Sequence, residues 1–371
     1  MSFRSQIAIL AHQRESMGEG ARIGLAVLAL VCVVVVGCAI GFGYNELLHL
    51  IEEETVEEPV PSGPEGLPAG TELDAEPNEI IGTYAVFSDR VVKLFKTNEE
   101  TLGKCVDAQI EMLGVVPNSV NRYLVVMPTR TTFEPSLVGY SDSELAAIGS
   151  AYAAMPQDVI CVDTVSKLQE HADDYLYYRT QRAATSEGTY WTSRAFIEAA
   201  DVAGIDISEY QADTRQVFNG VYISQFELST ASDTAPIYVH SDLPNKELVA
   251  HRLDNNEMSE LYEAPALAMS RGSYYAAIGD RAVFAEIEGA GGNGRTVLVL
   301  GDSDSRSFST WLITSFDRIL YVSTDWCPFS HEEFLALFNE YGVTDFVLYQ
   351  SVDSLSLGNG NTTLLELAGK E

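Results

Sequence analysis

The last third of the chain alternates short apolar runs with helical patterns. The runs at 296–300, 319–322 and 346–349 carry no charged residue, and the segments 307–316 and 331–341 beside them have the spacing of helices. Strands that are buried on both faces and connected through helices pair in parallel. The pattern therefore predicts an α/β fold in which helices cover both faces of a mostly parallel sheet.

The preceding part of the chain first shows the same alternation and then loses it. Two more apolar runs occur at 123–127 and 159–163. Two more helical patterns occur at 88–115 and 141–155. Residues 205–290 instead place aromatic residues among polar ones without a helical period, and Gly279-Asp280 is a favoured hairpin turn. We interpret 205–290 as a β-rich insertion in a domain that spans 80–371.

An uncharged apolar segment at 23–44 is long enough to cross a bilayer as one helix. Three arginines precede it, and no Lys or Arg follows until Arg90, so the positive-inside rule places residues 1–22 in the cytoplasm and the rest outside. The apolar run continues past Cys38 and lacks an evident cleavage site, which favours a single-pass anchor. A cleaved signal peptide and lipidation of Cys38 are the two alternatives.

Residues 45–79 are rich in Glu, Pro and Gly and predict a disordered, charge-extended tether. The whole chain has a formal net charge of −32. This charge argues against nucleic acid and against an anionic membrane surface as partners, because both would require basic residues. It is typical of a protein that stays soluble outside the cell by self-repulsion.

The five cysteines do not have the spacing of a disulfide framework or a zinc site. Cys32 and Cys38 fall within the apolar segment, whereas Cys105, Cys161 and Cys327 are far apart. One disulfide among the last three stays open. We expect no metal and no cofactor.

Residues 177–194, YYRTQRAATSEGTYWTSR, form a polar turn between helical patterns at 165–172 and 187–203. The order Tyr-Tyr-Arg-Thr, four residues, Thr-Ser, one residue, Gly resembles the signature of the DHHW family of bacterial envelope proteins. That family is SGNH-hydrolase-like and related to the alginate O-acetyltransferases. The resemblance extends over about 86–353 and implies a three-layer α/β/α fold.

The four central positions of this signature depart from the family pattern. Where the family has Asp-His-His-Trp, this chain has Gln181, Arg182, Ala183 and Ala184. In the family, the Asp and the first His act together with a distant serine. Glutamine cannot act as the carboxylate, and arginine stays protonated and cannot act as the base. The resemblance therefore implies that the frame of the motif is kept and its acid–base pair is lost.

Gly301-Asp302-Ser303 follows the apolar run at 296–300. A serine at the carboxyl end of a parallel strand is exposed at the sheet edge where ligands bind, and the N–H groups of a following helix can hold an oxyanion. A turn between strand and helix also uses these residues for capping alone. In the DHHW family and in SGNH hydrolases the serine is the nucleophile, so the resemblance makes Ser303 a vestigial nucleophile.

Other residues could supply a base or a ligand contact near this serine. A histidine could replace the lost base, although each is more commonly a surface or capping residue; the candidates are His171, His240, His251 and His331. Arginines could hold an anionic uronate or phosphate, and aromatic residues could stack on sugars; the candidates are Asp302, Arg306, Arg179, Tyr178 and Trp191, with Tyr177 and Tyr190 beside them. Ion pairing with the abundant carboxylates and packing in the core are the alternatives.

Three functions follow from these observations. The favoured one is a membrane-anchored, catalytically degenerate DHHW-like protein of the bacterial cell surface, which binds or scaffolds during envelope or exopolysaccharide modification. Its partners would be a cell-envelope polysaccharide or a membrane-bound acyltransferase. The second is an active serine O-acetyltransferase or carbohydrate esterase with a site rebuilt around Ser303. The third is a structural envelope protein without a ligand.

Overall fold

The computed structural model describes most of the chain after residue 75. The described residues are 76–213, 217–228, 232–234, 237–239, 247–254, 257–265, 278 and 282–370, all within the compact unit 61–371 rather than the unit 1–60. The predicted cytoplasmic segment 1–22, the predicted membrane segment 23–44 and nearly all of the predicted tether lie outside the described residues. Within the described ranges, no helix has the length and apolarity needed to cross a membrane.

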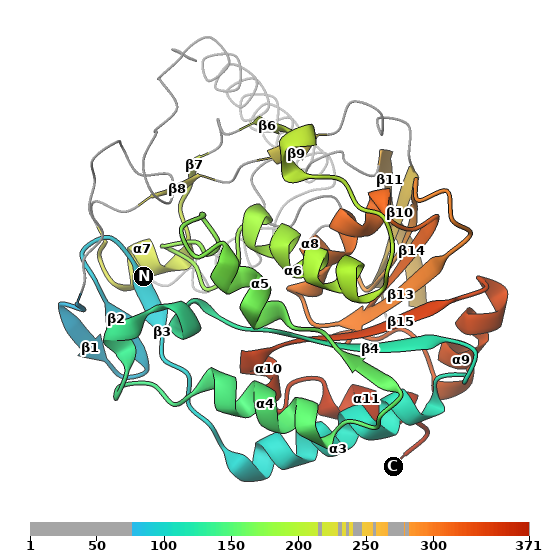
Figure 1. Cartoon of the computed structure of the whole chain (residues 1–371), viewed down its shortest axis with the longest axis horizontal. Coiled ribbons are helices and arrows are strands. Elements are labelled where there is room, and N and C mark those ends of the chain that lie inside the picture. Colours follow the sequence, from blue (N-terminus) through green and yellow to red (C-terminus); the bar gives the residue numbers. More distant parts are fainter. Residues whose placement is uncertain are drawn as a thin grey trace, which may run out of the picture. The chain divides into compact units, whose positions relative to one another are not determined.

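An eight-stranded sheet lies at the centre of the described residues (Figure 1). Its strands are β4 (Asn121–Met127), β5 (Val159–Cys161), β10 (Glu247–Asp254), β11 (Glu257–Pro265), β12 (Phe284–Glu288), β13 (Thr296–Gly301), β14 (Arg318–Ser323) and β15 (Asp345–Ser351). Their order is β11-β10-β12-β14-β13-β15-β4-β5. The five strands from β14 to β5 are parallel, as the apolar runs predict.

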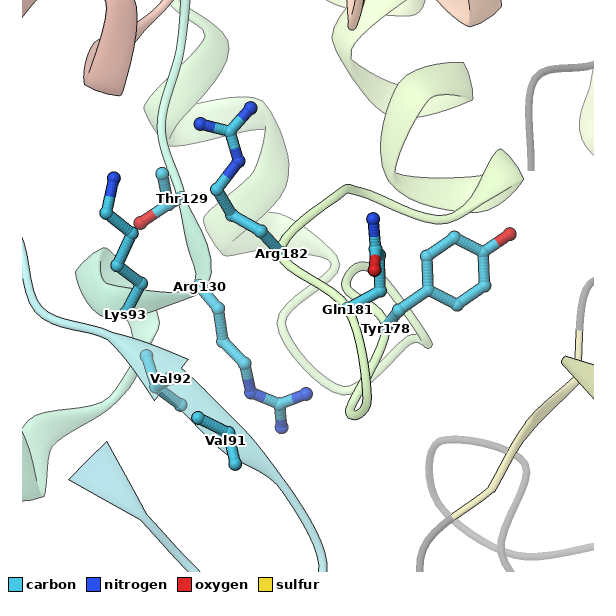
Figure 2. Close-up of a pocket in the computed structure, with 8 residues that line it drawn as sticks. All are labelled: Val91, Val92, Lys93, Thr129, Arg130, Tyr178, Gln181 and Arg182. Atoms are coloured by element: carbon cyan, nitrogen blue, oxygen red, sulfur yellow. The ribbon is translucent and has the colours of Figure 1, made fainter. Parts of the chain in front are cut away.

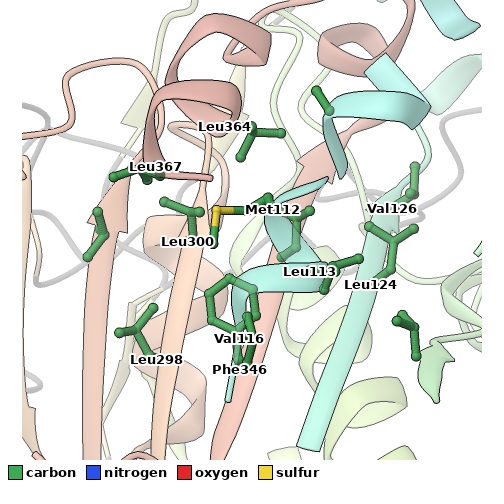
Figure 3. Close-up of a cluster of buried hydrophobic side chains, with 14 of the residues drawn as sticks. Met112, Leu113, Val116, Leu124, Val126, Leu298, Leu300, Phe346, Leu364 and Leu367 are labelled. Carbon is green, nitrogen blue, oxygen red and sulfur yellow. The ribbon is translucent and has the colours of Figure 1, made fainter. Parts of the chain in front are cut away.

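Five helices pack on one face of this sheet: α3 (Glu99–Val115), α4 (Glu144–Ala154), α9 (His331–Glu340), α10 (Val352–Leu357) and α11 (Asn361–Leu367). Because side chains alternate along a strand, every second residue of β13 faces them. Leu298 and Leu300 therefore pack with Met112 and Leu364 in one apolar cluster (Figure 3).

The opposite face of the sheet is covered by α5 (Thr164–Glu170), α6 (Ser186–Ala199) and α8 (Ser305–Trp311), which continues into η5 (Leu312–Thr314). The Phe196 ring lies 5.0 Å from the Tyr123 ring of β4 and 5.7 Å from the Phe308 ring of α8, centroid to centroid. Val297 and Val299 belong to this second cluster. The described residues thus form the three layers, helix–sheet–helix, that the sequence predicts.

Smaller elements surround the three layers. A three-stranded antiparallel sheet contains β1 (Glu79–Ile81), β2 (Tyr84–Val86) and β3 (Val91–Lys93). Short helical turns follow β4 at η2 (Arg130–Phe133) and η3 (Pro135–Leu137), and another follows α6 at η4 (Ile207–Glu209). The remaining described elements are β6 (Gln211–Asp213), β7 (Val217–Phe218), α7 (Val221–Gln225), β8 (Asp233–Thr234) and β9 (Ile237–Val239).

The structure differs from the predicted insertion at 205–290. Strands β10, β11 and β12 extend the central sheet by antiparallel pairing, with β12 joined to β14. These strands are therefore part of the core and not of a separate subregion. Aromatic residues among polar ones without a helical period indicate strands but not which sheet those strands join. The turn predicted at Gly279-Asp280 lies outside the described residues.

Candidate active site

The turn that follows β13 places Ser303 at the carboxyl edge of the parallel strands. The Asp302 carbonyl accepts hydrogen bonds from the N–H (3.0 Å) and the Oγ (2.7 Å) of Ser305, where α8 begins. A Cβ atom on Gly301 would lie 2.6 Å from Ser305 Oγ and 2.9 Å from the Tyr349 carbonyl, so this tight turn requires glycine. Ser303 itself is partly exposed at this edge.

The Asp302 carboxylate stabilises the turn and is not available to a ligand. It is buried, and its Oδ2 accepts hydrogen bonds from the Ser351 N–H and the Ser354 Oγ, both at 2.8 Å. Its Oδ1 accepts a third hydrogen bond from the Asp304 N–H at 3.2 Å. Asp302 therefore joins the turn to the start of α10, whereas the sequence suggested a contact with a ligand.

The frame of residues 177–188 that matches the family signature has structural reasons of its own. Thr185 caps α6 by accepting a hydrogen bond from the Gly188 N–H at 3.2 Å. A Cβ atom on Gly188 would overlap the Leu176 carbonyl, so glycine is required there. The Tyr177 hydroxyl donates to the Pro128 carbonyl at 2.9 Å. These residues therefore hold the turn in place whether or not the centre of the motif is catalytic.

Asp233, on β8, holds the first half of the motif in place through hydrogen bonds to its carboxylate. Its carboxylate accepts hydrogen bonds from the N–H groups of Arg179 (2.8 Å) and Thr180 (2.9 Å) and from the hydroxyls of Thr180 and Tyr175. The Arg179 side chain is 2% exposed, lies 3.6 Å from the Asp233 carboxylate and donates to the Ser232 carbonyl. Arg179 therefore points into the interior, whereas the sequence suggested a contact with a ligand.

Arg182 occupies the position of the family's first His and reaches the serine turn. Its Nη1 lies 3.0 Å from the Asp353 carboxylate, and its Nη2 lies 3.7 Å from the carboxylate of Asp304, the neighbour of Ser303. Lys93 also pairs with Asp353, at 3.1 Å. Partial burial lowers the pKa of the Arg182 guanidinium, but the surrounding aspartates raise it more. Arg182 is thus a fixed cation and not a base.

The carboxylates around the serine turn repel one another. Burial, the Asp302 carboxylate and Asp353 raise the pKa of Asp304 to about 6, although Arg182 opposes this shift. Burial and Asp302 also raise the pKa of Asp325, which follows β14. The backbone N–H of Ser303 faces the Asp325 carboxylate and acts against this rise of its pKa. An oxyanion on a substrate of Ser303 would need this N–H as a donor, and a carboxylate lies next to it.

Gln181, at the position of the family's Asp, does not orient a base. Its Oε1 accepts a hydrogen bond from the Val221 N–H at 3.3 Å, which attaches the motif to α7. A small pocket beside it has a volume of about 10 Å³ and is lined by Val91, Val92, Lys93, Thr129, Arg130, Tyr178, Gln181 and Arg182 (Figure 2). Such a volume holds about one water molecule, so this pocket does not accommodate a sugar.

His171 and Trp191 contact each other and not the serine. Their rings stack with centroids 3.3 Å apart, and the Asp174 carboxylate lies 3.1 Å from His171 Nδ1 and 3.2 Å from Trp191 Nε1. This arrangement uses the indole face in packing and the indole N–H in a hydrogen bond. The structure thus gives Trp191 a packing role, in contrast to the predicted ligand contact.

The other candidate histidines are also engaged elsewhere. His331 Nδ1 lies 2.7 Å from the Leu367 carbonyl, and the His251 ring stacks on Phe284 with centroids 5.3 Å apart. His240 lies outside the described residues. Within the described part of the chain, no hydrogen bond joins a histidine to the serine.

Two further candidates are interior residues. Tyr178 is 1% exposed, although it borders the small pocket. Arg306 is buried, donates to the Ala282 carbonyl at 3.3 Å and lies 5.8 Å from the centre of the Tyr321 ring. Neither side chain is exposed in the way that the predicted ligand contact requires.

The cysteines outside the apolar segment are free thiols; they are Cys105, Cys161 and Cys327. Burial raises the pKa of the Cys327 thiol to about 11 and that of Cys105 to about 12. In the ranges that the structure describes, no three His, Cys, Asp or Glu residues form a group able to hold a metal ion.

The structure adds three residues that the sequence analysis did not propose. Asp353 and Asp325 lie just beyond the carboxyl ends of β15 and β14, the two strands that flank β13. Polar residues after neighbouring parallel strands meet at one edge, and this rule could have identified both. Lys93 comes from the small N-terminal sheet, and no sequence pattern indicates its pairing with Asp353.

Comparisons with known proteins agree with this architecture. A family model described as "DHHW protein" matches residues 57–323. A DHHW family protein from Eubacterium siraeum is 20% identical, with a TM-score of 0.64 over 77% of this chain and 98% of that one. PatB1 of Bacillus cereus, solved with a sulfonyl adduct, is 14% identical, with a TM-score of 0.59 over 74% of this chain and 96% of that one.

A weaker likeness is to the O-acetyltransferase domain of AlgJ from Pseudomonas putida. It is 12% identical, with a TM-score of 0.45 over 74% of this chain and 93% of that one. No curated protein gives a significant sequence match.

Proposed function

Because this chain belongs to the DHHW family, we propose that it is a catalytically degenerate member that binds a ligand or partner during envelope O-acetylation. The ligand would be a cell-envelope polysaccharide and the protein partner a membrane-bound acyltransferase. The proposal places the folded domain outside a bacterial cell, tethered by 45–79 to a membrane helix at 23–44. The role in acetylation is taken from the family resemblance.

One observation carries the loss of catalysis: Arg182 is ion-paired beside Ser303 where the family has its base. A serine becomes a nucleophile at neutral pH only when a base accepts its proton. Arg182 donates and cannot accept, and the two aspartates that hold it keep it beside the turn. The Asp325 carboxylate, which the Ser303 N–H faces, adds a second obstacle, because its negative charge lies where an oxyanion would develop.

Sulfonylation of Ser303 by phenylmethylsulfonyl fluoride tests this proposal. We expect the wild-type chain to gain the adduct no faster than Ser303→Ala, measured by intact mass and peptide mapping. Restoring the acid–base pair in Gln181→Asp/Arg182→His should accelerate labelling of Ser303 by about 10²-fold, which is the usual contribution of a general base. Arg182→Lys is the matched control, since it keeps the charge and supplies no base.

A second function is favoured by one observation, the pKa of about 6 on Asp304 beside Ser303. A carboxylate with such a pKa is suited to general-base catalysis near neutral pH. An O-acetyltransferase or carbohydrate esterase rebuilt around Ser303 would then label rapidly in the wild type. Loss of that labelling in both Ser303→Ala and Asp304→Asn would refute the degenerate-site proposal and establish this alternative.

A further inference from the structure

A groove lies between α3 and α4, which pack side by side on one face of the sheet (Figure 1). This α3–α4 groove has a volume of about 660 Å³ and is lined by residues within 97–107 and 142–150. Binding pockets in proteins commonly enclose about 300–1,000 Å³. The groove is therefore large enough for an occupant, in contrast to the small pocket beside Gln181.

The floor of the α3–α4 groove is apolar. Leu102 and Val106 of α3 and Ala147 of α4 line it, and all three belong to the apolar cluster on this face of the sheet. The lining residues of each helix recur every three or four positions, which is one helix face over two turns. Two turns extend for about 11 Å. The groove is thus an elongated channel between two helices, the shape that a further helix can enter.

Gly103 keeps the α3–α4 groove open. It lies in the interior of α3 and lines the groove, and a Cβ atom placed on it would meet no described atom within 4 Å. Glycine in a helix interior is less favourable than other residues except proline. The described residues give no packing reason for a glycine at this position, whereas a helix seated in the groove would occupy the space that it leaves.

The α3–α4 groove carries an excess of negative charge. Glu99, Asp107 and Asp142 line it, and none of its described lining residues is basic. Lys96 lies 3.5 Å from Asp142, and both side chains are about half exposed. Among the described residues, no cation forms an ion pair with Glu99 or Asp107. A cationic occupant would therefore complement the groove.

An anionic occupant is disfavoured, although both helices begin at the groove. Helix N-termini attract anions through N–H groups that have no partner within the helix. Here the Asn98 side chain already accepts from the Thr101 N–H at 3.1 Å. The Ser143 hydroxyl accepts from the Ala146 N–H at the same distance. Glu99, in the first turn of α3, adds a negative charge that would repel an anion.

The start of α4 connects the α3–α4 groove to the candidate active site. Glu144, which follows the lining residue Ser143, is buried and accepts a hydrogen bond from the Thr129 N–H at 2.8 Å. Thr129 also lines the small pocket that Arg182 borders. A partner seated in the groove would therefore contact a helix that is hydrogen-bonded to the turn beside the motif.

Resting on the proposed function for the kind of partner, we propose that the α3–α4 groove receives a basic amphipathic helix of the protein partner. Its apolar side chains pack on Leu102, Val106 and Ala147, and its lysines or arginines pair with Glu99 and Asp107. The tether at 45–79 has no Lys or Arg and carries the wrong charge for this groove. A second copy of the chain is disfavoured because each copy has a net charge of −32.

Fluorescence anisotropy of labelled peptides with the full chain in a nonionic detergent tests this docking site. The probe is a peptide that contains the unit Leu-Lys-Lys-Leu-Leu-Lys-Leu twice, which places its leucines on one helical face. One counterpart has glutamate at every lysine, and the other has serine at every leucine. We expect the leucine–lysine probe to bind at least about tenfold more tightly than either counterpart, because only this probe has both an apolar face and positive charge.

Gly103→Leu should block the α3–α4 groove without destabilising the fold. Its side chain enters open space and favours the helix, so the midpoint of thermal unfolding should rise by about 2 °C. Binding of the leucine–lysine probe should weaken by at least about tenfold. Gly114→Leu is the matched control, because Gly114 also lies in α3, has no described atom near its Cβ position and does not line the groove. It should bind the probe as the wild type does.

Asp107→Lys tests the charge of the α3–α4 groove. It replaces an attraction by a repulsion and should weaken the leucine–lysine probe by about tenfold. Glu340→Lys, at the exposed end of α9, is the control with the same change in net charge.

Four outcomes would each overturn the docking site. They are no binding of the leucine–lysine probe, equal binding of either counterpart, binding by Gly103→Leu as tight as by Gly114→Leu, and equal effects of Asp107→Lys and Glu340→Lys. All four are independent of Ser303 sulfonylation, so the docking site can fail while the degenerate-site proposal stands.

Discussion

At the residue scale, the raised pKa of Asp304 makes stability depend on pH. Burial and Asp302 raise this pKa from 3.8 to about 6, so the folded state binds the proton more tightly than the unfolded state between these values. The resulting stabilisation is complete below about pH 4 and is lost as the pH rises through about 6. The side chain in Asp304→Asn cannot ionise, so this variant does not lose stability as the pH rises.

The free energy of unfolding of Asp304→Asn, relative to wild type, should therefore rise by about 2 kcal/mol between pH 4 and pH 7. Urea denaturation at a series of pH values measures it. Asp158→Asn is the control, because Asp158 is 63% exposed in its ion pair with Arg122 and surface pairs contribute little. A difference between Asp304→Asn and wild type that stays constant over this range would show that Asp304 does not titrate as described.

At the scale of elements, β8 holds the motif loop through the single side chain of Asp233. Replacing it with Asn keeps the shape of the side chain but changes one acceptor oxygen into an N–H donor. That donor then faces other donors, which are the N–H groups of Arg179 and Thr180 and the hydroxyls of Thr180 and Tyr175. Hydrogen bonds to a buried charge contribute about 1.5–3 kcal/mol each. We expect Asp233→Asn to lower the free energy of unfolding by about 3 kcal/mol.

Chemical denaturation measures this loss, and faster amide hydrogen exchange at Arg179 and Thr180 locates it. Asp206→Asn is the matched control, because Asp206 is an exposed cap that accepts from Ser208. Its effect should stay under about 1 kcal/mol. Unchanged exchange at Arg179 and Thr180 in Asp233→Asn would mean that other contacts hold the loop.

The same scale shows what the sequence could and could not predict. Runs such as 296–300 and 346–349 are apolar on both faces, so their strands and parallel pairing follow from burial alone. The antiparallel strands β10 and β11 have no such signature, and their membership in the central sheet depends on edge pairing. The turn at Ser303 was predictable because it follows a buried strand directly.

The contacts of the candidate site were less predictable than its position. Arg182 follows from comparison of the motif with its family, but its pairing with Asp353 joins residues 171 positions apart. Arg179 differs from Arg182 by only three positions and points into the interior. Local sequence does not distinguish the two, because the direction of each side chain is set by distant carboxylates, Asp233 for one and Asp353 for the other.

At the scale of the whole molecule, the net charge of −32 and the apolar segment at 23–44 imply different surroundings for different parts of the chain. A strongly acidic chain is repelled by anionic lipid headgroups, so adsorption to a bilayer surface is unfavourable. Stable association with a membrane therefore requires insertion of the apolar segment, and its three preceding arginines favour a cytoplasmic N-terminus. This leads to a prediction that separates the anchor from its two alternatives.

With the anchor, the full chain should sediment with membranes and resist a carbonate wash, whereas a chain lacking residues 1–44 should be soluble. Cys38→Ser should remain in the membrane fraction, as should the matched control Cys32→Ser. Release of Cys38→Ser alone would instead indicate lipidation, because the acyl chains and not the helix would then hold the protein. A soluble mature protein whose N-terminus begins near the end of 23–44 would indicate a cleaved signal peptide, since the apolar segment would then have been removed.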